Sequence, residues 1–136
     1  MIPCELCNHT GGELLWQGER CRVIHVEVAG YPGFCRVVWQ DHVKETTDLS
    51  DDDRAYLMQV VFAVEAVLRE ELAPLKVNLA SFGNAVPHLH WHVIPRYADD
   101  PHFPQPAWGE PLREMPATRP HPDTRALARA ISAALE

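Results

Sequence analysis

The 136-residue sequence lacks any run of about 18 consecutive apolar residues, so it contains no candidate transmembrane helix. Its first ten residues, MIPCELCNHT, lack both the basic start and the apolar stretch of a secretory signal peptide. We therefore expect a cytoplasmic location and no membrane partner. Internal repeats are also absent, and a 46% apolar fraction is sufficient for one compact core. The sequence thus predicts a single domain over residues 1–136.

Basic residues are scarce. The chain has 12 Lys and Arg against 19 Asp and Glu, which gives a formal net charge of -7, and no basic run is present. Polymeric nucleic acid is bound mainly through cationic contacts to phosphates, so this class of partner is disfavoured. A small anionic substrate needs only a few donors in one place. The 8 histidines of the chain are the first candidates, because five of them lie between His88 and His121.

The chain has only four cysteines, and a core of this size does not need disulfides to hold it. Cys4 and Cys7 form a single Cys-x-x-Cys pair, which is compatible with zinc ligation, a redox motif or two thiols without a role. A tetrahedral zinc site needs two further ligands, either the other two cysteines or histidines. Cys21 and Cys35 lie inside predicted strands, where cysteine is usually core filler, so a four-cysteine site is disfavoured.

Segments rich in β-branched and aromatic residues, separated by Gly and Pro, predict the strands. The predicted ranges are 13–18, 21–28, 34–40, 75–82 and 88–96. The first three are expected to form an antiparallel meander. The last two are expected to form a hairpin whose turn contains Gly83 and Pro87.

Two helices are predicted. Ser50 is a good N-cap, acidic residues follow it, and apolar residues recur at steps of three and four from Leu57 to Leu72 before Pro74. A second helix is predicted from Asp123, which is available as its cap. Its predicted buried stripe is Leu127, Ile131 and Leu135.

The order of strands, long helix and two strands predicts an α+β fold, with an antiparallel sheet and a helix packed on one face. The sheet and the long helix are expected to form a core over about residues 4–97. Eight of the 12 prolines fall between Pro95 and Pro122, which predicts an irregular surface loop over residues 98–122. The C-terminal helix occupies residues 123–136.

The stretch VPHLHWHVIPR places a histidine at every second position, at His88, His90 and His92. In an extended strand this spacing puts the three rings on one face and the intervening apolar residues on the other. The spacing alone does not decide between a metal site, since imidazole binds iron and zinc, and proton or phosphoryl chemistry.

The segment HLHWHVIPR resembles the His-x-His-x-His motif of the histidine triad (HIT) family, whose members are nucleotide hydrolases and nucleotidyl transferases. YPGFCRVVWQDHVKETTDLSDDD and NLASFGNAV are also similar to segments of this family, so the resemblance covers most of residues 4–96. The segment DDPHFPQPAWG is similar to a bacterial branch labelled diadenosine tetraphosphate hydrolases. The resemblance implies an HIT-like α+β fold, usually paired as a homodimer.

The resemblance also implies catalytic roles. His90 corresponds to the nucleophile that attacks the α-phosphorus of a nucleotide, and a neutral imidazole is a capable nucleophile near pH 7. His92 corresponds to a donor to the phosphoryl oxygens or to the leaving group. Uridylyltransferases of the family carry glutamine at this position, so a histidine favours the hydrolase branches. Asn84 follows Gly83 where many members carry a glutamine, and its amide can still donate.

Two further residues match substrate contacts of the family. Asn78 corresponds to the asparagine that contacts the nucleotide, although the segment up to Gly83 is one residue shorter than the common pattern. Glu27 corresponds to an acidic residue that accepts hydrogen bonds from ribose hydroxyls. A lone glutamate before a turn is more often only a solvated strand end.

In zinc-containing HIT proteins the ligands correspond to an N-terminal cysteine pair, a histidine after the third strand and the first triad histidine. The matching residues of this sequence are Cys4, Cys7, His42 and His88. A closed site of this kind is structural and stabilises the fold. The four remaining histidines match no motif and are predicted to lie at the surface, at positions His9, His25, His102 and His121.

The leading hypothesis is therefore a hydrolase that cleaves a nucleoside phosphoramidate or a dinucleoside polyphosphate through a nucleotidyl-His90 intermediate, with structural zinc and no organic cofactor. A nucleotidyl transferase is the first alternative. A non-catalytic nucleotide-binding or zinc-binding module and a metal-dependent oxygenase are the others.

Overall fold

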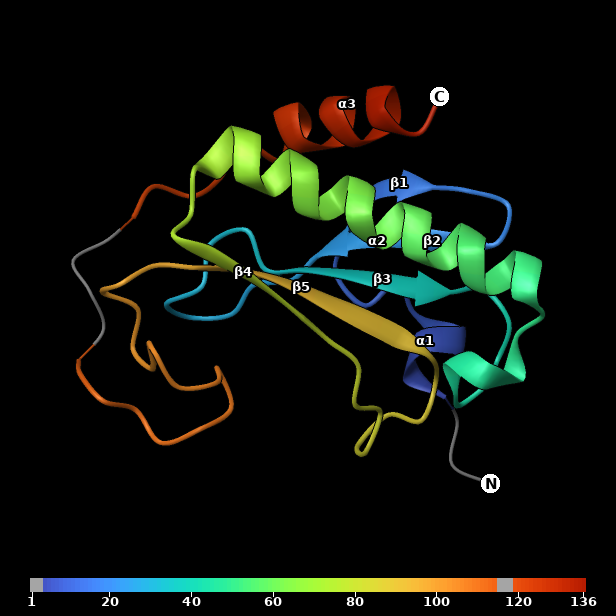
Figure 1. Ribbon diagram of the computed structural model, residues 1–136, viewed down its shortest axis with the longest axis horizontal. Helices are drawn as coiled ribbons and strands as arrows, with labels where there is room; N and C mark the ends of the chain where they lie inside the picture. The colour runs from blue at the N-terminus through green and yellow to red at the C-terminus, as the bar shows by residue number, and fades with distance from the viewer. Residues whose placement is uncertain (1–3, 115–118) are drawn as a thin grey trace.

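The computed structural model describes residues 4–114 and 119–136, which contain a five-stranded antiparallel sheet (Figure 1). The strands are β1 (Glu13–Gln17), β2 (Cys21–His25), β3 (Cys35–Trp39), β4 (Lys76–Ala80) and β5 (His90–Arg96). Their order in the sheet is β1-β2-β3-β5-β4. The predicted meander and the predicted hairpin are both present, and the pairing of β3 with β5 joins them. The predicted α+β class is confirmed.

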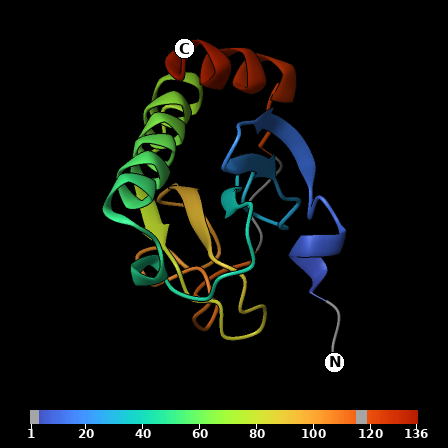
Figure 2. The same ribbon diagram turned by 90° about the vertical axis from the view of Figure 1, so that its right-hand side faces the viewer.

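The long helix α2 (Asp51–Leu72) and the C-terminal helix α3 (Thr124–Ala134) lie on the same face of the sheet (Figures 1 and 2). Both predicted caps are present, because Ser50 Oγ accepts from the Asp53 N–H at 3.2 Å and the Asp123 carboxylate accepts from the Ala126 N–H at 3.1 Å. Helix α2 contacts β3 and β5, whereas α3 contacts α2 and β1. A short helical turn, η1 (Thr46–Asp48), precedes α2.

The main core lies between these helices and the sheet. Period-two alternation along β3 and β5 places Val37 and Val93 on this face, opposite His90 and His92, and Leu89, just before β5, also joins the core. Cys21 and Cys35 are fully buried there, as expected of core filler. The helices contribute the buried side chains Leu57, Val60, Val61, Val64, Val67, Leu68, Leu127 and Ile131.

Residues 98–114 of the proline-rich segment (residues 98–122) lie across the sheet from α2 and α3, and residues 119–122 lead back to the start of α3 (Figure 1). Neither range contains a helix or strand. Residues 115–118 of the predicted loop lie outside the described part. The segment is irregular as predicted, but it is not only a surface loop. Asp100 is 1% exposed and pairs with the buried Arg96 of β5 at 2.7 Å, which fixes the start of the segment to the sheet.

Four points of the sequence analysis need correction. His88 lies before β5 instead of within it, because the strand begins at His90. Helix α1 (Glu5–Asn8) was not expected at the N-terminus. His25 is 3% exposed instead of lying at the surface, because β2 is an interior strand and the Gly33 N–H donates to its Nε2 at 3.3 Å. His102 is half-buried against Tyr31, whereas His9 and His121 are exposed as predicted.

Within the described ranges, no helix is both long and apolar enough to cross a membrane.

Candidate active site and metal cluster

His90 presents one ring nitrogen to a pocket because its other ring nitrogen is held by the backbone. The ring is 6% exposed, and Nδ1 lies 2.6 Å from the main-chain oxygen of His88. A carbonyl only accepts, so Nδ1 carries the proton and Nε2 keeps its lone pair. Burial lowers the pKa of His90, which leaves the ring neutral near pH 7. His90 is therefore prepared to act as a nucleophile through Nε2.

His92 has the opposite arrangement. Its Nδ1 accepts from Arg36 Nε at 3.3 Å, which places the ring proton on Nε2. Burial, the charge of Arg36 and the neighbouring His90 lower the pKa of His92 to about 3. The ring is thus a neutral hydrogen-bond donor at physiological pH. Its centroid lies 5.0 Å from that of His90, so a group bound at His90 Nε2 is next to this donor.

These two rings line a pocket of about 450 Å³. The pocket is completed by the loop of residues 82–86, by Arg36 and by Trp108 of the proline-rich segment. Gly83 has φ of 74°, a left-handed conformation that favours glycine, and it turns this loop at the pocket rim. Asn84 follows it and is exposed at the rim. The structure therefore brings together the predicted residues His90, His92, Gly83 and Asn84.

An aromatic wall stands beside the imidazoles. The rings of Phe82 and Trp108 lie 4.8 Å apart, and Trp108 lies 5.0 Å from the ring of His92. Both aromatic residues are about half exposed, at 57% and 52%. The two rings meet at 75°, so they form an angled apolar wall, and an exposed ring face of this kind suits an aromatic ligand ring.

Asn78 and Glu27 do not line this pocket. The Asn78 side-chain oxygen accepts from Arg96 Nη1 at 2.7 Å. The Glu27 carboxylate lies 2.6 Å from His121 Nε2 and 3.9 Å from His25 Nδ1. The Asn78 oxygen is thus bound to Arg96 and one Glu27 oxygen to His121, and the substrate contacts of both residues stay predictions.

Sequence reasoning missed five residues of the pocket, and the three with charged or aromatic side chains are Arg36, Phe82 and Trp108. Alternation along β3 does place Arg36 on the face opposite Cys35 and Val37. The missing information was that β3 pairs with β5, which puts Arg36 directly across from His92. Trp108 had no signal, because it lies in an irregular segment without periodicity.

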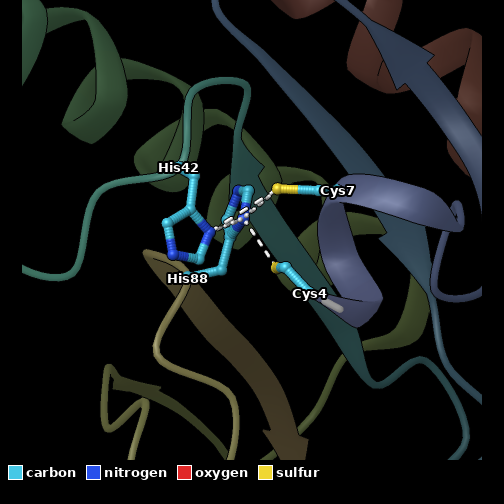
Figure 3. Close-up of side chains that lie close together, drawn as sticks. All are labelled: Cys4, Cys7, His42 and His88. Carbon is cyan, nitrogen blue, oxygen red and sulfur yellow. Dashed lines mark hydrogen bonds between the residues drawn. The ribbon is translucent and has the colours of Figure 1, made fainter. Parts of the chain in front are cut away.

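The second cluster consists of Cys4, Cys7, His42 and His88 and is called the metal cluster below. Figure 3 shows the four side chains converging, the cysteines from the α1 region and the histidines from the segments just after β3 and just before β5. Their ligand atoms all lie within 4.8 Å of one another. His88 Nδ1 lies 3.3 Å from Cys4 Sγ, 3.4 Å from Cys7 Sγ and 3.3 Å from His42 Nδ1.

These spacings fit a tetrahedral metal ion. Zinc bonds of about 2.05 Å to nitrogen and about 2.3 Å to sulfur imply ligand separations of about 3.3 Å between nitrogens and about 3.6 Å between nitrogen and sulfur. His88 Nε2 lies 2.6 Å from the Trp39 carbonyl oxygen, so Nε2 carries the proton and Nδ1 is free to ligate. The donor set and its outer hydrogen bond thus form a possible metal site.

A family model and solved structures that resemble this chain indicate the same family. The model of the HIT domain matches residues 11–99. A histidine triad protein from Sinorhizobium meliloti 1021 is 28% identical, with a TM-score of 0.72 over 91% of this chain and 90% of that one. A histidine triad protein from Bradyrhizobium japonicum is 29% identical, with a TM-score of 0.67 over 90% and 89% of the two chains.

An uncharacterized HIT-like protein from Saccharolobus solfataricus is 26% identical over 107 residues, which are 72% of this chain and 77% of that protein. The matched residues 11–99 contain β1 to β5, the pocket histidines and two of the four residues of the metal cluster. The domain match and the shared fold together show that this chain belongs to the HIT domain family.

Proposed function

We propose that this protein is a nucleotide hydrolase that cleaves at the α-phosphorus through a nucleotidyl-His90 intermediate. Membership of the HIT domain family supports nucleotide binding and hydrolase or transferase activity. The observation that carries the proposal is the pair of ring assignments. His90 offers an unprotonated Nε2, and His92 offers an Nε2–H donor beside it, in one pocket.

In this reaction His90 Nε2 attacks the α-phosphorus. The N–P bond forms as the bond from phosphorus to the leaving group breaks, and the leaving group keeps that electron pair. A phosphate departs as an anion, whereas an amine takes a proton from solvent. The His88 carbonyl stabilises the positive charge that develops on His90, and the His92 N–H donates to a phosphoryl oxygen.

Water completes the cycle by attacking the same phosphorus. The N–P bond breaks, its electron pair returns to His90 Nε2, and the proton of the water is released to solvent. Each turnover consumes one water and releases one nucleoside monophosphate. Adenosine phosphoramidates and dinucleoside polyphosphates, among them diadenosine tetraphosphate, are the proposed substrate classes.

The metal cluster supports a second part of the proposal, a bound structural zinc ion. Two thiolates and two imidazoles are ligands that zinc prefers, and four protein ligands leave no open position for substrate. Such an ion would join α1 to the segment that precedes β5. The cluster residues would therefore stabilise the fold and hold the His88 carbonyl against His90.

The test is a product assay in water enriched in oxygen-18. Wild type is expected to release labelled AMP from diadenosine tetraphosphate or adenosine phosphoramidate, which identifies water as the acceptor. His90→Ala should lower turnover by at least about 10³-fold, whereas His9→Ala, an exposed histidine outside the pocket, should not. Wild-type turnover in His90→Ala would overturn the proposal, and transfer of AMP to an added acceptor would favour a transferase.

A further inference from the structure

Arg36 is the positively charged residue among those that line the pocket. The resemblance to the family assigned no role to it. It lies in β3 at the register position opposite His92 of β5. Its Nε–H donates to His92 Nδ1 at 3.3 Å, and its side chain lines the pocket. The residue thus touches both a catalytic histidine and the space where a substrate would bind.

Three other arginines near the sheet have partners for their charge or their N–H groups. Arg96 pairs with Asp100, Arg20 contacts two carboxylates at the start of α2, and Arg22 donates to three main-chain carbonyls. Arg36 is half-buried, yet among residues 4–114 and 119–136 no carboxylate lies within ion-pairing distance of it. Within the described residues, the only hydrogen bond of its side chain goes from Nε to the neutral His92 ring.

A half-buried cation without an ion-pair partner is costly. Burial lowers the pKa of Arg36, although the charge of Glu5 acts in the opposite direction and the guanidinium lies 5.8 Å from the Phe34 ring. The cost is recovered when an anion binds, because a guanidinium forms strong, two-pronged hydrogen bonds to phosphoryl oxygens. This local charge also explains how a chain with a net charge of -7 can bind an anionic ligand.

We propose that Arg36 has two roles in this pocket. Its Nε–H positions His92 in the Nε2–H tautomer, and its terminal N–H groups bind a phosphoryl oxygen of the ligand. The first role is a property of the free protein. The second role rests on the proposed function only in assuming that the ligand is a nucleotide. In this role the positive charge of Arg36 recognises the phosphoryl group of that ligand.

Three substitutions separate these roles. Arg36→Gln keeps an N–H donor for His92 but removes the charge. Arg36→Lys keeps the charge but loses the guanidinium fork. Arg36→Met removes both and preserves the apolar stem. Arg125→Gln, on the exposed side of α3, is the matched control.

The first measurement is the tautomer of the His92 ring in the free protein, by long-range proton–nitrogen NMR at pH 7. Wild type and Arg36→Gln are expected to show an unprotonated Nδ1 and a protonated Nε2. In Arg36→Met we expect a mixture of tautomers. A protonated Nδ1 in wild type, or an unchanged spectrum in Arg36→Met, would overturn the positioning role.

The second measurement is calorimetric binding of AMP and of adenosine, which differ by the phosphoryl group. Arg36→Gln and Arg36→Met should weaken AMP binding by at least about tenfold, with less than about a twofold change for adenosine. Arg36→Lys should recover most of the preference for AMP. Equal effects on both ligands, or wild type that does not prefer AMP, would overturn the anion contact.

Neither measurement needs turnover, so the two proposals can fail separately. A preference for AMP that depends on Arg36, in a protein that cleaves no nucleotide, would reject the hydrolase and retain this inference. If Arg36→Met still turned over substrate and still preferred AMP to adenosine, the hydrolase would be retained and the inference on Arg36 rejected. Far-ultraviolet circular dichroism of each variant confirms that the fold is intact.

Discussion

His90 and His92 lie on one face of β5 but differ in which ring nitrogen carries the proton, because their Nδ1 atoms have different hydrogen-bond partners. Nδ1 of His90 donates to the His88 carbonyl, which leaves a lone pair on Nε2. Nδ1 of His92 accepts from Arg36, which leaves a proton on Nε2. The period-two spacing predicted the shared face, because it depends only on strand geometry. The tautomers could not be predicted, since they depend on a bend before β5 and on the pairing of β3 with β5.

The bend before β5 also explains why the position of the His88 ring was not predicted from the spacing. The spacing predicted three stacked rings, but the chain leaves the extended conformation before His90, and the His88 ring turns to the metal cluster. The family resemblance, not the spacing, separated His88 from the other two by assigning it to a cysteine pair. The structure places these four side chains together, as that resemblance implied.

At the residue scale the buried pair of Arg96 and Asp100 gives a pH prediction. Although burial alone would raise the pKa of the Asp100 carboxyl, hydrogen bonds from Arg96 and from three backbone N–H groups leave it below its usual value. A lowered carboxyl pKa stabilises the fold above the unfolded-state value of about 3.9, and this stabilisation is lost as pH falls through the folded-state value.

We therefore expect Asp100→Asn to lower the free energy of unfolding by about 3–5 kcal/mol at pH 7, because it leaves Arg96 buried without a counter-ion. Below pH 4 the difference from wild type should shrink. Urea unfolding at pH 7 and at pH 3 measures both effects, with Asp99→Asn, a more exposed neighbour, as the control. A difference that stays constant over this range would contradict the assignment.

At the scale of elements, α2 and α3 were predicted because each has an N-cap and an apolar stripe in its own sequence, whereas α1 has neither pattern and was missed. Helix α2 combines an N-cap, an acidic first turn and a long apolar stripe, all of which lie within the helix itself. Helix α1 has four residues and no periodicity. It is held by Arg22 of β2, whose guanidinium donates to the carbonyls of Leu6 and His9. Such a contact between distant segments has no local sequence pattern.

The contact between α3 and the core leads to a stability prediction. Ile131 is fully buried in the main core, on the face of α3 that packs toward α2 and β1. Ile131→Ala should lower the free energy of unfolding by about 2–5 kcal/mol, because it removes buried methyl groups and leaves a cavity. Arg129→Ala, exposed on the same helix, should change it by less than about 0.5 kcal/mol. Chemical denaturation that gave equal values for the two variants would show that α3 does not pack as described.

The proline-rich segment leads to a prediction about the ligand. Trp108 is the residue of this segment that lines the pocket, next to Phe82 and His92. Trp108→Ala should weaken AMP binding by about two- to twelvefold, because an aromatic contact of this kind contributes about 0.5–1.5 kcal/mol. Phe62→Ala, an exposed aromatic on α2, is the control for calorimetry. Unchanged affinity in Trp108→Ala would mean that the segment does not contribute to binding.

At the scale of the whole molecule, the order of strands was the part of the fold that local patterns left open. The meander and the hairpin follow from short connections, whereas β3 and β5 are joined across the whole of α2 and β4. That pairing creates the pocket by bringing Arg36 beside His92. The homodimer and the cytoplasmic location stay predictions.

The metal cluster connects distant parts of the chain, since Cys4 and His88 are 84 positions apart. We expect one zinc ion per chain by elemental analysis. Its removal by a chelator should lower the Tm by about 10 °C or more, because a tightly bound ion stabilises the folded state by mass action.

Cys7→Ser should reproduce that loss, whereas His9→Ala, which is close in sequence but outside the cluster, should bind zinc and melt as wild type does. A purified protein that contains no metal and whose Tm is insensitive to both chelator and added zinc would reject the structural zinc site. The pocket assignments would not be affected by that result.

The measurement that tests the central claim most directly is intact-mass spectrometry after rapid mixing with adenosine phosphoramidate or diadenosine tetraphosphate. The quench must avoid acid, because an N–P bond to histidine is acid-labile. The proposed mechanism predicts an increase equal to one adenylyl group on wild type and none on His90→Ala. Product formation by wild type with no adduct at any mixing time, or the same adduct on His90→Ala, would contradict a covalent role for His90.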